Sequence, residues 1–567
     1  MANAPQFETV EQAIRHMVEN DPAWAVTQEE IRGVKHRAFA ELSANLGEVF
    51  AFGAMHGDAP FLVYEEQRLS FAETYALSCR LANALVAKMG VKPGDRVAIA
   101  MRNYPEFILA YQAIILAGAV ATPLNAWWTT RELQYAFEDS GAKLVIGDKR
   151  RLDRITPFAS DLGVKIISVR GDHEAGEATL DGLIEGEAET TPPQTGVGRD
   201  DPATLMYTSG STGYPKGVLS SHRGVMTTLK SWLLILAGGL AVPDPRYPAV
   251  PEGKQMGVLL ALPLFHVTAT HSLYLMSLFV GRKIVMIRKW DVEETLRLIE
   301  AEEITHFVGV PTMTAELAQA CSETDRNMAS LIDISSGGAK RPPEHVARQR
   351  KLTPNAAAAS GYGLTETNAI GAIINRADYE ARPDAAGKVV PPVTEVKIAG
   401  EDGKALPVGE IGEICIRSPA NMIEYWNRPE DTKAVFDEEG YLRSGDLGRL
   451  DEDGFLYVQG RVKDMILRGG ENIAALEVEE AFYEHPGVAE IAVIGLPDER
   501  LGEAVGAVVY LHEGEAADED ALRAFAAERL AGFKIPERFW FRDEPLPRGG
   551  TAKIDKLTVK KLYAGSE

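Results

Sequence analysis

The stretch Tyr207-Thr-Ser-Gly-Ser-Thr-Gly-Tyr-Pro-Lys216-Gly217 is the most informative part of this sequence, and an apolar strand is predicted just before it, at residues 204–207. Glycines let backbone N–H groups turn toward an anion, and hydroxyls and a lysine add further donors. The stretch therefore predicts a phosphate-binding loop, although its glycine spacing does not fit G-x-x-x-x-G-K-[ST]. The candidate phosphate-binding residues are Thr208, Ser209, Gly210, Ser211, Thr212, Gly213 and Lys216.

Around this loop, the sequence alternates between helix and strand patterns from about residue 60. Helices are predicted at residues 78–89 and 110–117, and short buried strands at residues 96–101, 144–146 and 166–169. Strands that alternate with helices indicate parallel sheets with both faces covered. The expected class is α/β.

The pattern changes after about residue 385, where strands become short and Gly and Pro frequent. Short strands with frequent Gly and Pro predict an antiparallel, barrel-like segment. The last hundred residues alternate between helix and strand again and predict a small α+β unit. We therefore expect a large domain over residues 1–459, built of two helix-covered sheets and a small β-barrel, and a small domain over residues 460–567.

Length and composition limit the classes of fold and function. A chain of 567 residues is too long for a single hydrophobic core, so at least two domains are expected. Its net charge of −23 argues against nucleic acid as the main partner. The three cysteines are widely separated, which predicts neither a disulfide framework nor a zinc site.

The N-terminus has no apolar leader, and the most apolar stretch, residues 232–242, is too short to span a membrane. It is either a buried helix or one wall of an apolar pocket. We expect a cytoplasmic protein without a transmembrane segment.

Four further segments carry side chains suited to a nucleotide. The segment Ser360-Gly-Tyr-Gly-Leu-Thr-Glu366 ends in a carboxylate. Close to phosphate groups, the Glu366 carboxylate would repel them unless a hard cation lay between. Asp446 can accept hydrogen bonds from both hydroxyls of a ribose. The small residues of Ser336-Gly-Gly-Ala339 allow the backbone to approach a flat base. Lys553, near the C-terminus, offers a compact cation for charge that develops between two anions.

Together, these segments resemble the motifs of the adenylate-forming superfamily, which includes acyl-CoA synthetases, adenylation domains and beetle luciferases. They occur in the family's order over roughly residues 60 to 560. The resemblance implies that Glu366 and Thr208 hold Mg²⁺, and that Lys553, Glu366 and Thr208 are catalytic. It places ATP or AMP against the phosphate-binding loop and a second set of residues. That set is Gly338, Ala339, Lys340, Ser360, Gly361, Tyr362, Gly363, Leu364, Thr365, Asp446, Arg461 and Lys553.

The resemblance also implies a mobile C-terminal domain that turns about a hinge at Lys463. By this resemblance, the rotation moves Lys553 out of the active site and brings in a loop that lies beside the pantetheine arm of CoA. The residues of that loop are Arg468, Gly469, Gly470 and Glu471. Two details depart from the family pattern. Ala474-Ala475-Leu476 stands where Tyr-Pro or a similar pair is usual, and Ala552 stands where Gly commonly precedes the lysine.

The expected activity is that of an AMP-forming acid–thiol ligase, an acyl-CoA synthetase that uses ATP, Mg²⁺ and coenzyme A. The acid pocket is expected at His266, Val267 and Gly363, and a hydrophobic acid is favoured, with a medium- or long-chain fatty acid first and an aryl or terpenoid-like acid second. The alternative is an adenylating enzyme that passes its acyl group to a carrier-protein thiol or an amine. No carrier domain follows Lys553 within the sequence, so CoA is the expected acceptor. A homodimer is left open.

Overall fold

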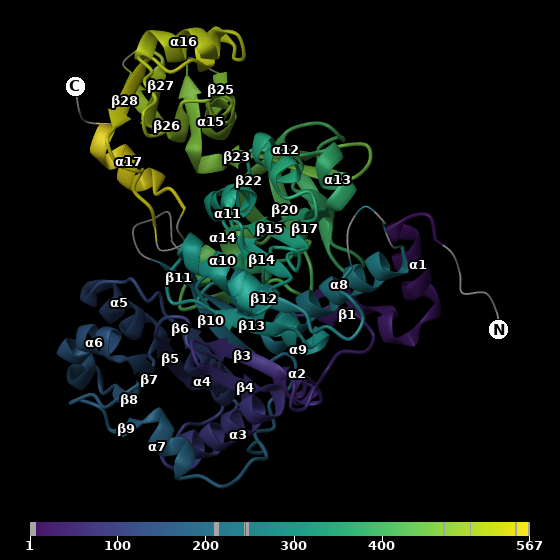
Figure 1. The fold of residues 1–567 in the computed structure, drawn as a ribbon, viewed down its shortest axis with the longest axis vertical. Coiled ribbons are helices and arrows are strands. Elements are labelled where there is room, and N and C mark those ends of the chain that lie inside the picture. Colours follow the sequence, from purple (N-terminus) through teal and green to yellow (C-terminus); the bar gives the residue numbers. More distant parts are fainter. Residues whose placement is uncertain are drawn as a thin grey trace.

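The computed structural model describes residues 7–208, 215–242, 244, 246, 249–468, 471–498, 500–549 and 553–564, with the side chains of Glu471 and Asn472 left out. Figure 1 shows a large part, which carries two large mixed sheets, and a smaller C-terminal part stacked on one end of it. This is the mixed α/β class that the sequence predicts, with a small α+β unit at the end of the chain.

The first sheet has eight strands in the order β21-β11-β10-β6-β5-β7-β8-β9. Its central strands β10, β6, β5, β7 and β8 are parallel to their neighbours in that run. The strands are β5 (Arg96–Ala100), β6 (Val120–Pro123), β7 (Leu144–Asp148), β8 (Lys165–Val169), β9 (Ala178–Thr179), β10 (Pro202–Thr208), β11 (Lys216–Ser221) and β21 (Glu424–Tyr425).

The second sheet has thirteen strands in the order β19-β20-β22-β23-β18-β17-β16-β15-β14-β12-β13-β3-β4. Strands β3 and β12 to β16 pair in parallel, whereas the antiparallel piece predicted after residue 385 continues this sheet through β17, β18 and β23. The strands are β3 (Pro60–Tyr64), β4 (Gln67–Ser70), β12 (Gly257–Leu260), β13 (Lys283–Met286), β14 (His306–Gly309), β15 (Asp333–Gly337), β16 (Ala357–Gly363), β17 (Gly371–Asn375), β18 (Gly387–Val389), β19 (Glu395–Ala399), β20 (Gly412–Arg417), β22 (Leu442–Leu450) and β23 (Phe455–Arg461).

Strand β15 runs through Gly337, so it includes the first two residues of the predicted segment Ser336-Gly-Gly-Ala339. It does so because Ser336 and Gly337 pair with Ser360 and Gly361 of β16, so that ladder hydrogen bonds extend the strand. Two of the predicted nucleotide-binding segments therefore lie side by side.

Helices cover both large sheets, and an N-terminal hairpin of β1 (Val26–Ile31) and β2 (Val34–Phe39) lies apart from them. The helices of the large part are α1 (Val10–Asn20), α2 (Leu46–Ala54), α3 (Phe71–Ala87), α4 (Pro105–Leu116), α5 (Thr130–Ser140), α6 (Lys149–Leu162), α7 (Leu180–Glu185), α8 (His222–Ala241), α9 (Met276–Val280), α10 (Val292–Ala301), α11 (Pro311–Glu323), α12 (Pro343–Leu352), α13 (Arg376–Ala381) and α14 (Pro429–Val435). A π-helix, η2 (Thr268–Leu275), precedes α9.

One continuous apolar core joins the two large sheets. Every residue of α4 is buried, and α3 begins with a capping box in which Ser70 and Glu73 satisfy free backbone N–H groups. Leu85 of α3 and Phe107 of α4 belong to the same buried cluster as Ile99 of the first sheet and Leu259 of the second. The core thus holds the carboxyl ends of both sets of parallel strands in a fixed relation.

Helix α8 contains most of the apolar stretch at residues 232–242. Among the described residues it is the one helix long and apolar enough to cross a membrane, which by itself is weak evidence because buried core helices pass the same test. Leu234 is fully buried against Ile14 of α1 and Phe39 of β2. Gly238 is also buried, whereas Leu236 and Leu240 are 42% and 74% exposed. The stretch therefore packs one side against the N-terminal segment and leaves the other side at the surface, and none of its residues lines the large cavity of the protein.

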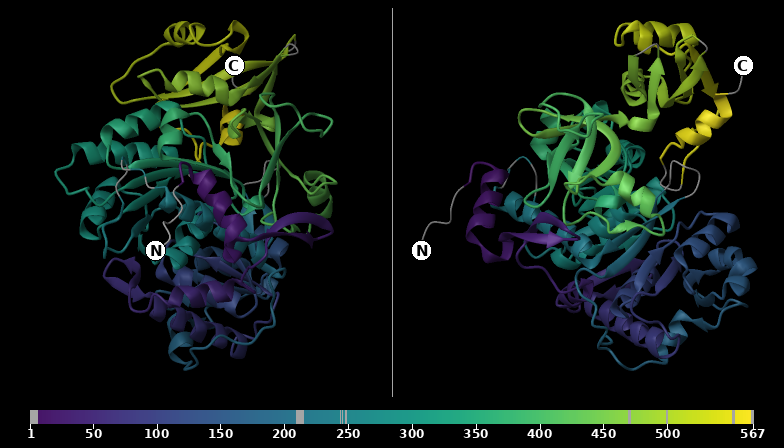
Figure 2. Two further views of the ribbon diagram at one scale, coloured as in Figure 1. Left: turned by 90° about the vertical axis from the view of Figure 1, so that its right-hand side faces the viewer. Right: turned by 180° about the vertical axis from the view of Figure 1, so that it is seen from behind.

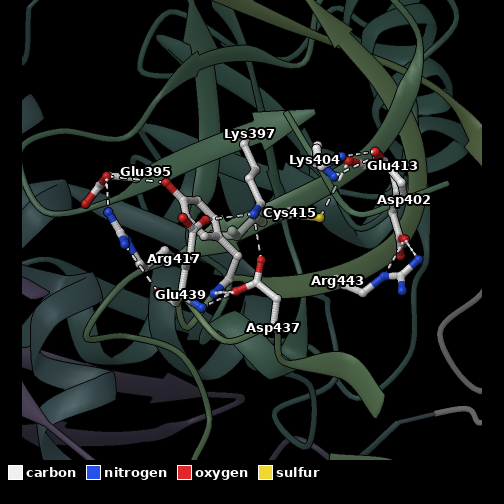
Figure 3. Close-up of polar contacts among 12 residues, drawn as sticks. Glu395, Lys397, Asp402, Lys404, Glu413, Cys415, Arg417, Asp437, Glu439 and Arg443 are labelled. Carbon is white, nitrogen blue, oxygen red and sulfur yellow. Dashed lines mark hydrogen bonds and ion pairs between the residues drawn. The ribbon is translucent and has the colours of Figure 1, made fainter. Parts of the chain in front are cut away.

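Ion pairs brace the antiparallel end of the second sheet (Figure 3). Lys397 on β19 contacts Asp437 and Glu439, and Arg417 on β20 pairs with Glu395 on β19. Arg443 on β22 pairs with Glu413 on β20. Because each pair ties two chain segments together, the network supports the strand that carries Asp446.

The C-terminal part is built on a third sheet, in the order β25-β24-β27-β26 with β28 paired to β27. Its elements are β24 (Met465–Arg468), β25 (Glu471–Ala474), α15 (Ala475–Tyr483), β26 (Val488–Asp498), β27 (Gly502–Leu511), α16 (Glu519–Ala527), β28 (Arg538–Arg542) and α17 (Lys556–Tyr563). Val478, Phe482 and Val505 pack in its own buried core. Figure 2 shows this part above the antiparallel end of the second sheet, where β25 and α15 contact β23.

Candidate active site

A cavity of about 890 Å³ lies between the large part and the C-terminal part. The loop after β15, strand β16 and the antiparallel strands β22 and β23 contribute to its wall, and the loop before α17 closes it from the C-terminal side. Nucleotide residues predicted from sequence that line it are Gly338, Ala339, Lys340, Ser360, Gly361, Tyr362, Gly363, Leu364, Asp446, Arg461 and Lys553. Segments more than two hundred residues apart in sequence therefore meet around one space.

Asp446 is held from both sides at the floor of this cavity. The Tyr362 hydroxyl donates to Asp446 Oδ2 at 2.8 Å, and Arg461 Nε lies 2.9 Å from Oδ1. Asp446 and Arg461 are opposite each other in the β22–β23 ladder, which places the two side chains together. Burial raises the pKa of the Asp446 carboxyl, and Arg461, Tyr362 and Lys553 oppose that rise. Each carboxylate oxygen keeps a lone pair for a further donor, such as a ribose hydroxyl.

Lys553 reaches into the same cavity from the C-terminal part. Its Cε lies 3.6 Å from the position that a Cβ on Gly338 would occupy, and Gly338 has a φ of +81°, where glycine is favoured. The side chain keeps exposed surface. Desolvation and then the nearby Arg461 lower the pKa of the Lys553 ammonium to about 8, against the opposite effect of Asp446. A cation thus lies beside two of the predicted nucleotide segments.

Glu366 follows β16 and is oriented by a residue that no sequence motif indicated. The hydroxyl of Tyr425 on β21 donates to Glu366 Oε1 at 2.7 Å, and Met422 N donates to the Glu366 carbonyl at 2.7 Å. Lys216 lies over the Tyr425 ring at 4.9 Å and pairs with Asp431 at 3.1 Å. Tyr425 thereby links Glu366 to the strand that follows the phosphate-binding loop.

Thr208 ends strand β10 directly opposite Lys216 on β11, and its hydroxyl lies 3.5 Å from the Lys216 carbonyl oxygen. Ser209, Gly210, Ser211, Thr212 and Gly213 lie outside the described residues, as do Gly469 and Gly470 of the predicted CoA-side loop. The two strands that flank the phosphate-binding loop are described, and the β10–β11 pairing continues to its base.

Lys340 lines the cavity and also contacts the C-terminal part. Its Nζ donates to the Val458 carbonyl at 3.0 Å and lies 2.6 Å from Oε1 of Glu480 on α15. Burial raises the pKa of the Glu480 carboxyl, and Lys340 opposes that rise. The pair ties the loop after β15 to the C-terminal part.

Comparison with known proteins matches this architecture to one family. Residues 49–426 match the family model described as AMP-binding enzyme, and residues 477–553 match the AMP-binding enzyme C-terminal domain. The chain belongs to the AMP-binding enzyme family. It is 37% identical over 496 residues to a feruloyl-CoA synthase of Amycolatopsis sp, across 87% of this chain and 94% of that protein.

Two further relatives of this AMP-binding enzyme differ in the acid that their names state. A long-chain-fatty-acid–CoA ligase of Mycobacterium tuberculosis is 32% identical over 502 residues, across 88% of this chain and 94% of that protein. The structure of o-succinylbenzoate coenzyme A synthetase from Bacillus subtilis, in complex with ATP and magnesium ion, matches with a TM-score of 0.75. It is 32% identical and covers 91% of this chain and 98% of that one.

The predicted hinge of the AMP-binding enzyme lies between two sheets. Arg461 ends β23 in the second sheet, Lys463 lies in the short turn of residues 462–464, and Met465 begins β24 in the third sheet. Burial and the adjacent Arg461 lower the pKa of the Lys463 ammonium. Arg468, of the predicted CoA-side loop, pairs with Glu537 within the C-terminal part. The third sheet thus begins at Met465, and both the domain boundary at residue 460 and the rotation about Lys463 stay predictions.

The predicted acid-pocket residues fall into two groups. Gly363 lines the cavity, and a Cβ on it would lie 2.3 Å from the Ala369 carbonyl oxygen, so no larger residue fits. His266 packs on Phe265 with ring centroids 4.4 Å apart, and Phe265 packs on Trp127 at 5.2 Å. Val267 is buried and directly precedes the π-helix η2. His266 and Val267 thus belong to an aromatic and apolar layer beside the cavity.

Sequence reasoning missed three residues that shape this site. Tyr425 orients Glu366, and Glu480 contacts Lys340. Arg341 lines the cavity although it is only 2% exposed, and it donates to Gln349. A pattern search could have flagged Arg341, since a charged residue directly follows the Gly-Gly-Ala-Lys loop. Tyr425 and Glu480 carry no local signal because their partners are distant in sequence.

Proposed function

We propose that this chain is an ATP-dependent, AMP-forming acyl-CoA ligase that activates a hydrophobic carboxylic acid by way of an acyl-AMP. The observation that carries the proposal is the meeting of Lys553, Gly338 and Asp446 in one cavity between the two parts of the chain. A ribose contact and a mobile cation in one site suit attack of a carboxylate on the α-phosphorus of ATP.

In the first half-reaction, Asp446 would accept from the ribose hydroxyls while Tyr362 and Arg461 hold its carboxylate in place. Lys553 would neutralise charge shared between the acid carboxylate and the α-phosphate. The C–O–P bond of the acyl-AMP forms as the bond from the α-phosphorus to pyrophosphate breaks. Phosphoryl transfer depends chiefly on positioning and charge neutralisation, and the acid is already ionised, so no general base is needed.

Glu366 and Thr208 form an oxygen donor set of the kind that Mg²⁺ prefers. The fit is supported by Tyr425, whose donation to Oε1 leaves Glu366 Oε2 for a cation. When bound, Mg²⁺ would neutralise phosphate charge and polarise the phosphoryl oxygens. Glu366 and Thr208 would hold the ion, and Tyr425 would keep the Glu366 carboxylate turned toward it.

In the second half-reaction, the thiol of CoA would attack the acyl carbon and AMP would leave. We propose that residues 460–567 move as a unit about Lys463 for this step, because Arg468 does not line the cavity in this arrangement whereas Lys553 does. CoA is favoured over a carrier-protein thiol because the relatives named above are CoA ligases and synthetases.

The acid is proposed only to the level of a hydrophobic carboxylic acid. A fatty acid was the first expectation, but the packing of residues 232–242 against α1 removes one reason for it, and the relatives' names include both an aryl and a long-chain acid.

An ATP–pyrophosphate exchange screen with hydroxycinnamic, benzoic and C6 to C18 fatty acids tests the activity. Mass spectrometry of the products with CoA tests the acceptor. No exchange with any acid would contradict the proposal.

A further inference from the structure

Lys553 lies on the second of two chain arms, residues 546–549 and 553–556, that pair with each other. Gly549 N donates to the Lys553 carbonyl at 2.8 Å, and Asp555 N donates to a carbonyl of the first arm at 2.7 Å. The second arm leads directly into α17. The position of Lys553 therefore depends on what holds the two arms, and each arm is held by a carboxylate of the C-terminal part.

The first arm is fixed to β26 by Glu490. Its Oε2 accepts from Leu546 N at 2.7 Å, and its Oε1 pairs with Arg548. The Leu546 side chain is buried in the same cluster as Val508 of β27 and Val559 of α17. The core of the C-terminal part thus holds this arm as well.

The second arm is fixed to α15 by a buried ion pair. Lys556 Nζ lies 2.7 Å from Glu479 Oε1, and the Glu479 side chain is only 6% exposed. The same oxygen accepts from Val493 N on β26 at 2.7 Å. Burial raises the pKa of the Glu479 carboxyl, and Lys556 opposes that rise. Because a carboxylate that is buried without a counter-ion is strongly unfavourable, Glu479 holds the Lys556 ammonium in place.

Helix α15 also contacts the segment of the large part that Lys553 approaches. Glu480 on this helix pairs with Lys340 at 2.6 Å, and Lys340 lies two residues after Gly338, beside which Lys553 Cε is placed. The contacts thus form a closed ring, which runs from the loop after β15 to α15, along the second arm to Lys553, and back to the same loop. A change in the link between α15 and the second arm would therefore move Lys553 relative to that loop.

We propose that Glu479, acting through Lys556, is a positioning residue that sets where Lys553 lies in the cavity during adenylation. This inference rests on the proposed function, which gives Lys553 the neutralisation of charge in the first half-reaction. A cation stabilises a transition state only if it is held where charge develops. Loss of the pair is therefore expected to lower kcat for adenylation. The KM for ATP should change little, because Asp446 and its partners lie in the large part.

Variants of the pair separate this role from a purely structural one. Lys556→Met and Glu479→Gln are compared with Lys560→Met, the matched control, because Lys560 lies on the same helix and pairs with Glu503 instead. We expect the two pair variants to lower kcat for pyrophosphate exchange about tenfold, with KM for ATP within about twofold of the wild type. Lys560→Met should stay near the wild type, and Lys556→Arg should recover most of the rate.

The second half-reaction is the internal reference for these variants. Thioester formation from pre-made acyl-AMP should stay near the wild-type rate in all of them, because Lys553 has no part in that step. A normal rate also verifies that each variant is folded. Equal loss in both half-reactions, or a rise in KM for ATP without a fall in kcat, overturns the positioning role.

A double-variant cycle tests whether Lys556 acts through Lys553. On a Lys553→Ala background, Lys556→Met should cause little further loss of pyrophosphate exchange, because the cation that it positions is already gone. An undiminished loss, again about tenfold, would mean that Lys556 acts on the substrates by itself and would overturn the proposal.

Hydrogen exchange tests the link to α15 without turnover. Amide exchange in peptides that span residues 554–563 is followed by mass spectrometry in the wild type, Lys556→Met, Glu479→Gln and Lys560→Met. The two pair variants should exchange severalfold faster there than the control, because the start of α17 loses its tie to α15. Exchange equal to the control overturns the link. If no acid supports pyrophosphate exchange, the proposed function fails, yet hydrogen exchange still decides whether Glu479 holds the second arm.

Discussion

Lys553 Cε lies 3.6 Å from the position that a Cβ on Gly338 would take, so a side chain from the C-terminal part lies beside the residue that follows β15 in the large part. Desolvation and Arg461 lower the pKa of this ammonium to about 8. The arrangement is the one expected for the adenylation half-reaction, and its consequences can be measured one residue at a time.

Replacing Lys553 by Ala is expected to reduce adenylation on the order of a hundredfold or more, because a fixed cation in the transition state is lost. Thioester formation from pre-made acyl-AMP should stay near the wild-type rate, since we propose that the rotation about Lys463 removes Lys553 from the cavity for that step. Pyrophosphate exchange and the isolated second half-reaction measure the two effects. Equal loss in both would contradict the domain rearrangement.

The lowered pKa of Lys553 makes a prediction about pH. The ammonium is charged below about pH 8 and loses its proton above it, so kcat/KM for adenylation should fall as pH rises through about 8. Lys553→Arg, which stays charged, should lose this alkaline limb while it keeps part of the activity. A pH profile of pyrophosphate exchange measures both. An unchanged limb in the arginine variant would assign the titration to another group.

Much of this site could be predicted from sequence because each motif keeps its reactive side chain within a short segment. Asp446 and Lys553 were both named from such segments, and both line the cavity. The pairing of Ser336 with Ser360 could not be predicted, because it depends on the register between two parallel strands. Nor could Tyr425 be linked to Glu366, since 59 residues separate them, and the β11–β21 pairing and the bond from Met422 N to the Glu366 carbonyl bring Tyr425 close.

Tyr425 offers a graded test of the Glu366 assignment. Glu366→Gln should lower activity strongly and raise the Mg²⁺ concentration needed for half-maximal rate, since a carboxylate that holds the ion is lost. Tyr425→Phe removes only the hydroxyl that donates to Oε1, so it should shift the Mg²⁺ requirement in the same direction by a smaller factor. A normal Mg²⁺ titration in Glu366→Gln would show that Glu366 acts in another way.

The contact between Lys340 and Glu480 is expected to hold the C-terminal part in the adenylation arrangement. Glu480→Gln should therefore slow adenylation about three- to tenfold without slowing thioester formation from acyl-AMP. Glu477→Gln is the matched control, because Glu477 lies on the same helix but pairs with Lys534 inside the C-terminal part. If both variants change the two half-reactions alike, the contact has no role in the arrangement.

The central claim is that the acid carboxylate attacks the α-phosphorus of ATP. The most direct test supplies an acid labelled with ¹⁸O in its carboxylate, together with ATP, Mg²⁺ and CoA, and analyses the products by mass spectrometry. The account predicts acyl-CoA and AMP in equal amounts, with one ¹⁸O atom transferred from the acid to the AMP phosphate. Formation of ADP, or of AMP without the label, would contradict it.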